Sequence, residues 1–151
     1  MPQLRSEHLM RLTADFDEPQ TIDGPHGPRR ILYMTSGAFA GPKLVGKVLP
    51  RGADWVITRP DGVFQLDIRL TMQADDGALI YVSSCGMLDL PADKRDRIRQ
   101  GEHLPSSEYY FRTTLQFETG AEPYRWLNRL LAVGVGTRTP GGMSTEVFAL
   151  V

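Results

Sequence analysis

Three short segments combine carboxyl, guanidinium and phenol groups at spacings that would let them act together. Asp67 and Arg69 lie two positions apart, as do Tyr110 and Arg112, and Asp54 lies in a third segment. A carboxyl group acts as a general base when burial raises its pKa toward the working pH. A desolvated guanidinium binds a carboxylate or stabilises an enolate oxygen, and a phenol donates a hydrogen bond. The candidate catalytic residues are therefore Asp54, Asp67 and Tyr110.

The candidate substrate-binding residues are of two kinds. Arg69 and Arg112 would hold a charged or carbonyl oxygen of the ligand, and Tyr81 would add a phenolic donor. Aromatic walls and one orienting amide would complete the site. These are Trp55, Phe39, Trp126 and Asn128. The competing interpretation is that these polar groups face solvent or set strand register, and that the aromatic residues are ordinary packing.

The segment that carries Asp67 and Arg69 is the clearest strand in the chain. From Val63 to Met72 apolar and polar residues alternate, which is the period of a strand with one dry face. The residues Arg59-Pro60-Asp61-Gly62 precede it and Asp75-Asp76-Gly77 follow it, and both stretches are typical of tight turns. We therefore expect it to be the middle strand of three.

Short apolar stretches separated by turn residues continue along the whole chain, with 15 glycines and 11 prolines among them. This spacing predicts eight or more short strands. The expected strands are Arg30–Thr35, Lys43–Leu49, Asp54–Thr58, Val63–Met72, Ala78–Ser84, Tyr109–Phe117, Arg129–Val135 and Ser144–Leu150. Closure would remove the free edges of so many strands, so the prediction is an all-β fold, a closed or nearly closed antiparallel barrel.

Two segments depart from this pattern. Leu90 to Gly101 has a proline near its start, a glycine at its end and almost no apolar face, so it predicts one surface helix that could cover the barrel. Residues Met1 to Gln20 predict a first strand or an arm.

Length and charge restrict the class of protein. The 151 residues are enough for one domain, residues 1–151, and the net charge is −1 from 17 basic and 18 acidic residues. This balance argues against a partner bound through bulk charge, so neither nucleic acid nor membrane is expected. One cysteine excludes an internal disulfide. Without an expected signal sequence or membrane span, the predicted location is cytoplasmic.

Several short motifs in the chain do not predict a site. Gly134-Val135-Gly136 lacks the surroundings of a dinucleotide fingerprint, and no Gly-x-Ser-x-Gly elbow occurs. His8, His26 and His103 have no metal-ligand spacing. No cofactor is therefore expected.

A series of phrases resembles one family of uncharacterised proteins, DUF3237, also called UPF0311. They follow the family's order from about Gly27 to the C-terminus. The phrases are Gly37-Ala38-Phe39-Ala40-Gly41-Pro42-Lys43-Leu44-Val45-Gly46, Gly52-Ala53-Asp54-Trp55, Asp61-Gly62, Leu66-Asp67-Ile68-Arg69, Asp76-Gly77-Ala78-Leu79-Ile80-Tyr81, Tyr109-Tyr110-Phe111-Arg112-Thr113, Phe117-Glu118-Thr119 and Trp126-Leu127-Asn128.

The resemblance implies a lipocalin-like β-barrel, similar to that of allene oxide cyclase, in a family whose members mostly lack an assigned activity. Two departures from the family pattern bear on the polarity of a pocket. Ser36 replaces a usual glycine, and Ser84-Cys85 replaces a dipeptide that commonly resembles Asn-Arg.

The residues favour a barrel that binds a small molecule in its lumen. The leading hypothesis is a cofactor-independent isomerase or lyase that acts on a small carbonyl or phenolic metabolite by acid/base chemistry. A non-catalytic carrier of a small apolar ligand and a scaffold filled by its own side chains are the alternatives. A homodimer would be expected if Tyr109, Phe111 and Leu115 lay outside the core.

Overall fold

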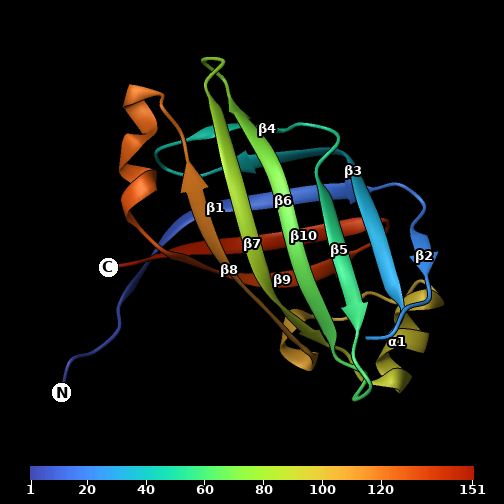
Figure 1. Cartoon of the computed structure of the whole chain (residues 1–151). Helices are drawn as coiled ribbons and strands as arrows, with labels where there is room; N and C mark the ends of the chain where they lie inside the picture. The colour runs from blue at the N-terminus through green and yellow to red at the C-terminus, as the bar shows by residue number, and fades with distance from the viewer.

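Ten antiparallel strands join into one sheet in the computed structural model, which describes all residues from 1 to 151. Six long strands lie side by side and make up most of the wall. In spatial order they are β1 (Ser6–Phe16), β10 (Gly142–Leu150), β9 (Ala132–Thr139), β8 (Tyr110–Glu118), β7 (Leu79–Asp89) and β6 (Phe64–Ala74). Figure 1 shows β6, β7 and β8 crossing in front of β1, β9 and β10.

The sheet closes on itself through β3 (Arg29–Ala40). Strand β6 pairs with β5 (Ala53–Thr58) and β4 (Val45–Val48), both of these pair with β3, and β3 pairs with β1. The result is a closed eight-strand barrel with two further strands, since β4 and β5 share one place in the ring and β2 (Gln20–Ile22) pairs only with β3. The predicted antiparallel barrel is confirmed.

The alternation that predicted the central strand also determines which side chains enter the barrel. In β6 the even-numbered residues from Leu66 to Ala74 are buried, whereas Asp67 and Arg69 are exposed. Each fully buried large aliphatic side chain contributes about 1.5–3 kcal/mol relative to leaving it in water. The apolar face of β6 therefore strongly disfavours any register that would turn Asp67 and Arg69 inward.

The turns on both sides of β6 form as their residues predict. Gly62 and Gly77 have φ values of +86° and +90°, a left-handed conformation that L side chains rarely adopt. The Arg59 N–H donates to the Val63 carbonyl at 2.9 Å and closes the first turn. These turns hold β5, β6 and β7 as consecutive antiparallel neighbours.

Several strand boundaries differ from the prediction. β9 begins at Ala132 rather than Arg129, because residues Glu122–Arg129 form the 3-10 helix η2. β3 continues to Ala40 through residues expected in a turn, and Gly37 there approaches the Thr13 carbonyl too closely for any side chain. The N-terminal segment holds β1, which closes the ring.

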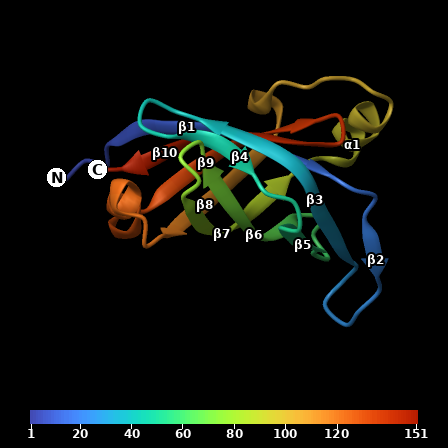
Figure 2. The same cartoon turned by 90° about the horizontal axis from the view of Figure 1, so that it is seen from above.

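The predicted surface helix is α1 (Ala92–Arg99), and none of its residues is buried. It lies with the short 3-10 helix η1 (Ser106–Glu108) at the end of the barrel opposite η2 (Figure 1). Figure 2 shows α1 beside the turn that joins β9 to β10. None of the helices has the length and apolar character that crossing a membrane requires.

The face proposed for a homodimer belongs to the core. Tyr109, Phe111 and Leu115 are at most 7% exposed and pack inside the barrel. The reason is again the two-residue period, which turns Tyr110 and Arg112 outward when Phe111 points inward. The condition on which the homodimer was expected is therefore not met on this face.

Candidate functional site

An inner chamber lies inside the barrel at the end nearest α1. Its volume is about 30 Å³, and most of its wall is apolar. Its lining consists of Phe16, Arg30, Leu32, Asp54, Val56, Phe64, Leu66, Leu88, Phe111, Arg138, Gly142 and Met143. One carboxyl and two guanidinium groups thus share a small space inside an otherwise apolar barrel.

Asp54 is the carboxyl group of this chamber, and strand register places it there. It pairs with Ile68 on β6 and with Leu32 on β3, and it is only 4% exposed. The β5–β6 pairing is interrupted after Asp54, where the Asp67 N–H donates to Asp54 Oδ1 at 3.1 Å. This bond holds one carboxyl oxygen, and no hydrogen bond occupies Oδ2.

Burial raises the pKa of Asp54 from 3.8 to about 7. The amide of Asp67 and the positive charge of Arg138 act in the opposite direction, whereas the negative charge of Asp67 adds to the rise. The loss of hydration is the largest of these effects, because a carboxylate in an apolar chamber has few groups to replace water. Asp54 can therefore change its protonation state near neutral pH.

Arg138 reaches the same chamber from β9. Its own N–H donates to the Tyr109 hydroxyl at 2.8 Å, which fixes the backbone at this point. Burial and the nearby charge of Arg30 lower the pKa of Arg138, although a guanidinium remains protonated in proteins. Its Nε is buried and has no hydrogen-bond partner. The guanidinium is thus held in a poorly solvated place beside a second positive charge.

An outer chamber of about 340 Å³ lies between the barrel end and α1. A volume of this size falls in the range of small-molecule sites. It is lined by Arg30, Phe64, Leu90, Arg95, Ile98, Arg99, Gly101, Glu102, His103, Leu104, Arg138, Thr139, Pro140 and Gly141. The guanidinium carbon of Arg95 lies 5.3 Å from the ring centre of Phe64, so α1 contacts the barrel mouth directly.

The two chambers meet at three shared residues, Arg30, Phe64 and Arg138. A molecule in the outer chamber would therefore contact the side chains that also face Asp54. The inner chamber is too small for a metabolite, but it can receive one functional group. Together the chambers can bind the body of a small molecule outside and present one end of it to a titratable carboxyl inside.

Of the predicted catalytic residues, only Asp54 faces this site. Asp67 and Tyr110 lie on the outer face of the barrel, with 52% of the Asp67 side chain and 51% of Tyr110 exposed. The inward placement expected for Asp67 and Tyr110 is wrong, because their neighbours Ile68 and Phe111 occupy the interior.

The arginines proposed to bind substrate also point away from the lumen. The Arg69 side chain is 61% exposed and lies 3.8 Å from Asp67 Oδ1, an ion pair within the outer face of β6. The Arg112 guanidinium lies 5.2 Å from the ring centre of Tyr110 on the outer face of β8. The predicted inward direction of Arg69 and Arg112 is wrong, because alternate residues of a strand face opposite sides and their apolar neighbours face inward. The positive charge that faces Asp54 comes from Arg30 and Arg138 instead.

The remaining predicted residues are scattered. Trp55 and Tyr81 lie on the outside of β5 and β7, and Phe39 is fully buried in the core. Trp126 and Asn128 belong to η2 at the far end, where Asn128 exchanges two hydrogen bonds of 2.8 Å with the Thr119 backbone. The expectation that they meet the carboxyl group is wrong, because sequence spacing does not determine which end of a barrel a residue occupies.

Five residues that line the chambers were not among the predicted site residues. They are Arg30, Phe64, Arg95, His103 and Arg138. A signal existed for Arg138, because the two-residue period from Gly134 and Gly136 puts it on the same face as these glycines. Gly136 lies against the buried ring of Phe111, so this face is the interior. The predicted helix over Leu90–Gly101 was expected to be able to cover the barrel, but the sequence does not show which end it covers or which of its side chains face the mouth.

The two departures from the family pattern have different surroundings. Ser36 lies outside and donates from Oγ to Asp15 Oδ2 at 3.1 Å. Ser84 is 8% exposed and lies inside the barrel, whereas Cys85 is exposed on its outer face. Only Ser84 therefore changes the polarity of the interior.

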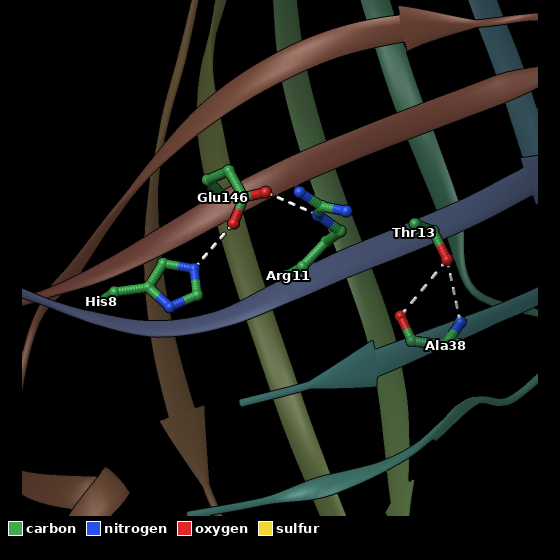
Figure 3. Close-up of polar contacts among 5 residues, drawn as sticks. All are labelled: His8, Arg11, Thr13, Ala38 and Glu146. Carbon is green, nitrogen blue, oxygen red and sulfur yellow. Dashed lines mark hydrogen bonds and ion pairs between the residues drawn. The ribbon is translucent and has the colours of Figure 1, made fainter. Parts of the chain in front are cut away.

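A polar cluster on the opposite wall is structural. On the outer faces of β1 and β10, Glu146 accepts hydrogen bonds from His8 Nε2 at 2.7 Å and from Arg11 Nε at 2.6 Å (Figure 3). Thr13 and Ala38 link β1 to β3 nearby (Figure 3). Partial burial raises the pKa of Glu146, but the bonds from His8 and Arg11 outweigh it and lower the pKa overall. These contacts join β1 to β10 and to β3, and they line neither chamber.

Comparison with known proteins places the chain among proteins without an assigned role. Residues 4–150 match the family described as "Protein of unknown function (DUF3237)". A UPF0311 protein of Clostridium acetobutylicum is 34% identical over 150 residues, 98% of this chain and 95% of that protein.

Solved structures share the barrel. A conserved protein of unknown function from Rhodopseudomonas palustris superposes with a TM-score of 0.91 at 31% identity, over 100% of this chain and 99% of that one. An enzyme from Penicillium herquei superposes with a TM-score of 0.72 at 20% identity, over 100% of this chain and 98% of that one, and it shows similarity of fold alone.

Proposed function

The chain belongs to the DUF3237 family, and from the geometry at the mouth of its barrel we propose that it is a cofactor-independent isomerase or lyase for a small carbonyl or phenolic metabolite. One observation carries this proposal. Asp54, whose pKa lies near neutrality, faces Arg30 and Arg138 across an apolar chamber that shares three lining residues with a larger one. A general base works best when its pKa is close to the working pH.

The chemistry follows from the positions of the charges. Asp54 Oδ2 takes a proton from the carbon next to a carbonyl group, the C–H bond breaks, and its electron pair moves to the carbonyl oxygen as an enolate. Arg138 or Arg30 stabilises the negative charge on that oxygen. Asp54 then returns the proton to another carbon in an isomerisation, whereas in a lyase reaction the enolate expels a leaving group from the neighbouring carbon.

Proton exchange tests this proposal before any natural substrate is known. Para-hydroxyphenylacetone, a neutral phenolic ketone, is incubated in deuterated buffer, and loss of the methylene signal next to its carbonyl is followed by NMR. We expect the protein to accelerate exchange above the buffer rate. The rate should rise with pH and level off above pH 7, because the base form of Asp54 is required.

Two variants separate the proposed base from the rest of the surface. Asp54→Asn removes the base and should reduce the enzymatic exchange rate ~10²–10⁴-fold. Asp75→Asn removes an exposed carboxylate in the turn after β6, outside the lining of both chambers, and should leave exchange close to that of the original chain. Equal exchange by both variants would refute the role of Asp54.

The carrier remains the second candidate, since eight of the twelve residues that line the inner chamber are hydrophobic. A carrier would bind the phenolic ketone without accelerating exchange, and binding would be insensitive to the state of Asp54. Saturable binding by calorimetry without any exchange would therefore favour the carrier over the enzyme.

A further inference from the structure

The lining of the outer chamber is strongly basic although the chain as a whole carries a net charge of −1. It contains four arginines and one glutamate. The glutamate, Glu102, is already engaged by Arg97 through hydrogen bonds of 2.9 and 2.6 Å. Arg99 lies 3.2 Å from Asp96, which leaves three arginines of the lining without an ion pair. These are Arg30, Arg95 and Arg138.

Two of these arginines are also incompletely hydrogen-bonded. The Nε atoms of Arg95 and Arg138 are buried and have no acceptor. Buried polar groups in proteins are nearly always paired, because leaving one unpaired costs about 1–3 kcal/mol and more when it is charged. No carboxylate of the chain approaches them within ion-pair distance. A carboxylate bound by the outer guanidinium N–H groups would supply the negative charge that these arginines lack.

The form of the site favours a carboxylate over a phosphate. Every unpaired cation in the lining is a planar guanidinium, whose parallel N–H groups pair with two oxygens of a carboxylate or of a phosphate, so the rest of the lining must distinguish these two anions. Helix N-termini are the usual phosphate sites, yet α1 contributes Arg95, Ile98 and Arg99 from its middle and C-terminal turn. The rest of the wall includes Phe64, Leu90, Ile98 and Leu104, which suit an organic body.

We infer that the outer chamber binds a small organic acid and that its carboxylate is held by Arg138 together with Arg30 and Arg95. The inference rests on the proposed function and narrows its substrate class to carbonyl or phenolic compounds that carry a carboxylate. Arg138 lines both chambers, so a carboxylate bound there brings the adjoining carbonyl group to the chamber that Asp54 lines. A keto acid fits this arrangement.

A matched pair of probes tests the inference. Para-hydroxyphenylpyruvate and para-hydroxyphenylacetone share the ring, the methylene and the carbonyl, and differ in a carboxylate against a methyl group. Binding of each is measured by calorimetry to the full chain. We expect the acid to bind about ten- to a hundred-fold more tightly, the effect of one charge-assisted hydrogen-bonding pair.

Variants locate the effect. Arg138→Gln should remove most of the preference for the acid. Arg138→Lys should keep only part of it, because lysine keeps the positive charge but cannot donate the two parallel N–H bonds of a guanidinium. Arg30→Gln provides a second test should Arg138→Gln fail to fold by circular dichroism. Arg69→Gln, on the outer face, is the matched control and should keep the full preference.

The outcomes are distinct. Equal affinity for the two probes, or a preference that survives both Arg138→Gln and Arg30→Gln, overturns the carboxylate inference, while Asp54-dependent exchange of the ketone would still support the proposed function. Arginine-dependent binding of the acid without exchange supports the inference and refutes catalysis. Binding of inorganic phosphate but of neither organic probe would overturn the inference in favour of a phosphate site.

Discussion

At the scale of single residues, the most informative feature is a carboxyl group that folding makes less acidic. Asp54 lies among apolar side chains of seven strands, and its neighbouring charges are Asp67 on β6, Arg138 on β9 and Arg30 on β3. Burial outweighs the favourable effect of Arg138, so the neutral acid is stabilised. The chain keeps a group that weakens its fold at high pH, as expected where function rather than stability determines a residue.

Replacing this carboxyl group should stabilise the barrel in a pH-dependent way. The folded pKa of about 7 lies above the ordinary value of 3.8, so wild-type stability declines as pH rises between these values. Asp54→Asn removes that loss and can still accept the Asp67 N–H. Urea unfolding should show the variant more stable above pH 7, by about 4 kcal/mol at most, and similar to wild type near pH 4. A variant that is less stable throughout would show that the carboxyl group serves packing.

At the scale of elements, one glycine of β9, Gly136, leaves room for an aromatic side chain of the neighbouring strand β8. A Cβ atom at Gly136 would lie 2.6 Å from the ring of Phe111, which lines the inner chamber. The same strand then delivers Arg138 to the mouth. The shape of the chamber and the position of its cation therefore depend on one alternating strand.

Gly136→Ala tests this arrangement. The added methyl group must displace the Phe111 ring, so we expect about 1–3 kcal/mol of destabilisation and weaker binding of para-hydroxyphenylpyruvate. Gly120→Ala is the control, since no atom lies within 4 Å of a Cβ there. Thermal unfolding and calorimetry measure both effects. Unchanged binding by a folded Gly136→Ala variant would show that Phe111 does not shape the site.

Helix α1 is the least firmly held part of the site. None of its residues is buried, and its contact with the barrel mouth runs through Arg95 on Phe64 and the partly buried Ile98. Few buried contacts imply a low free energy of local opening. Movement of α1 would admit a ligand to the outer chamber.

Hydrogen exchange followed by mass spectrometry should reveal this difference. We expect the amides of α1 to exchange much faster than those of β6, which pairs on both sides within the ring. Adding para-hydroxyphenylpyruvate should slow exchange in α1 if Arg95 holds the carboxylate. Protection of α1 equal to that of β6 without ligand would contradict this description.

At the scale of the whole molecule, closure of the sheet separates two kinds of surface. The outside carries paired charges such as Arg11 with Glu146, while the mouth collects arginines without partners. The net charge of the chain is nearly zero, yet the unpaired arginines make the local potential at the mouth positive. Charge measured over the chain therefore says little about the site.

Added salt should weaken the attraction between this positive potential and a bound anion. Raising ionic strength from 0.01 to 1 M shortens the screening length from roughly 30 to 3 Å. We expect the affinity for para-hydroxyphenylpyruvate to fall with added salt and that for para-hydroxyphenylacetone to remain nearly constant. Calorimetric titrations at several salt concentrations give both series. A parallel response of the two probes would mean that the mouth does not attract the anion.

Much of the architecture could be predicted because strand alternation and turn chemistry are local. The period of β6, the turns at Gly62 and Gly77 and the surface position of α1 all follow from neighbouring residues. The predicted start of β9 at Arg129 is wrong, because the residues before Ala132 include a short 3-10 helix, and such a helix has no hydrophobic period as clear as that of a strand.

The sequence by itself determined an antiparallel barrel, its family and Asp54 as a candidate base. Only the tertiary structure decided which charges meet Asp54, because Arg30, Arg95 and Arg138 come from segments far apart in the chain and meet only when the ring closes and α1 packs on its mouth. Arg69 and Arg112 have the same chemistry but lie on the solvent face of their strands. Local patterns specify which residues share a face, whereas register and closure specify where that face is and what lies opposite it.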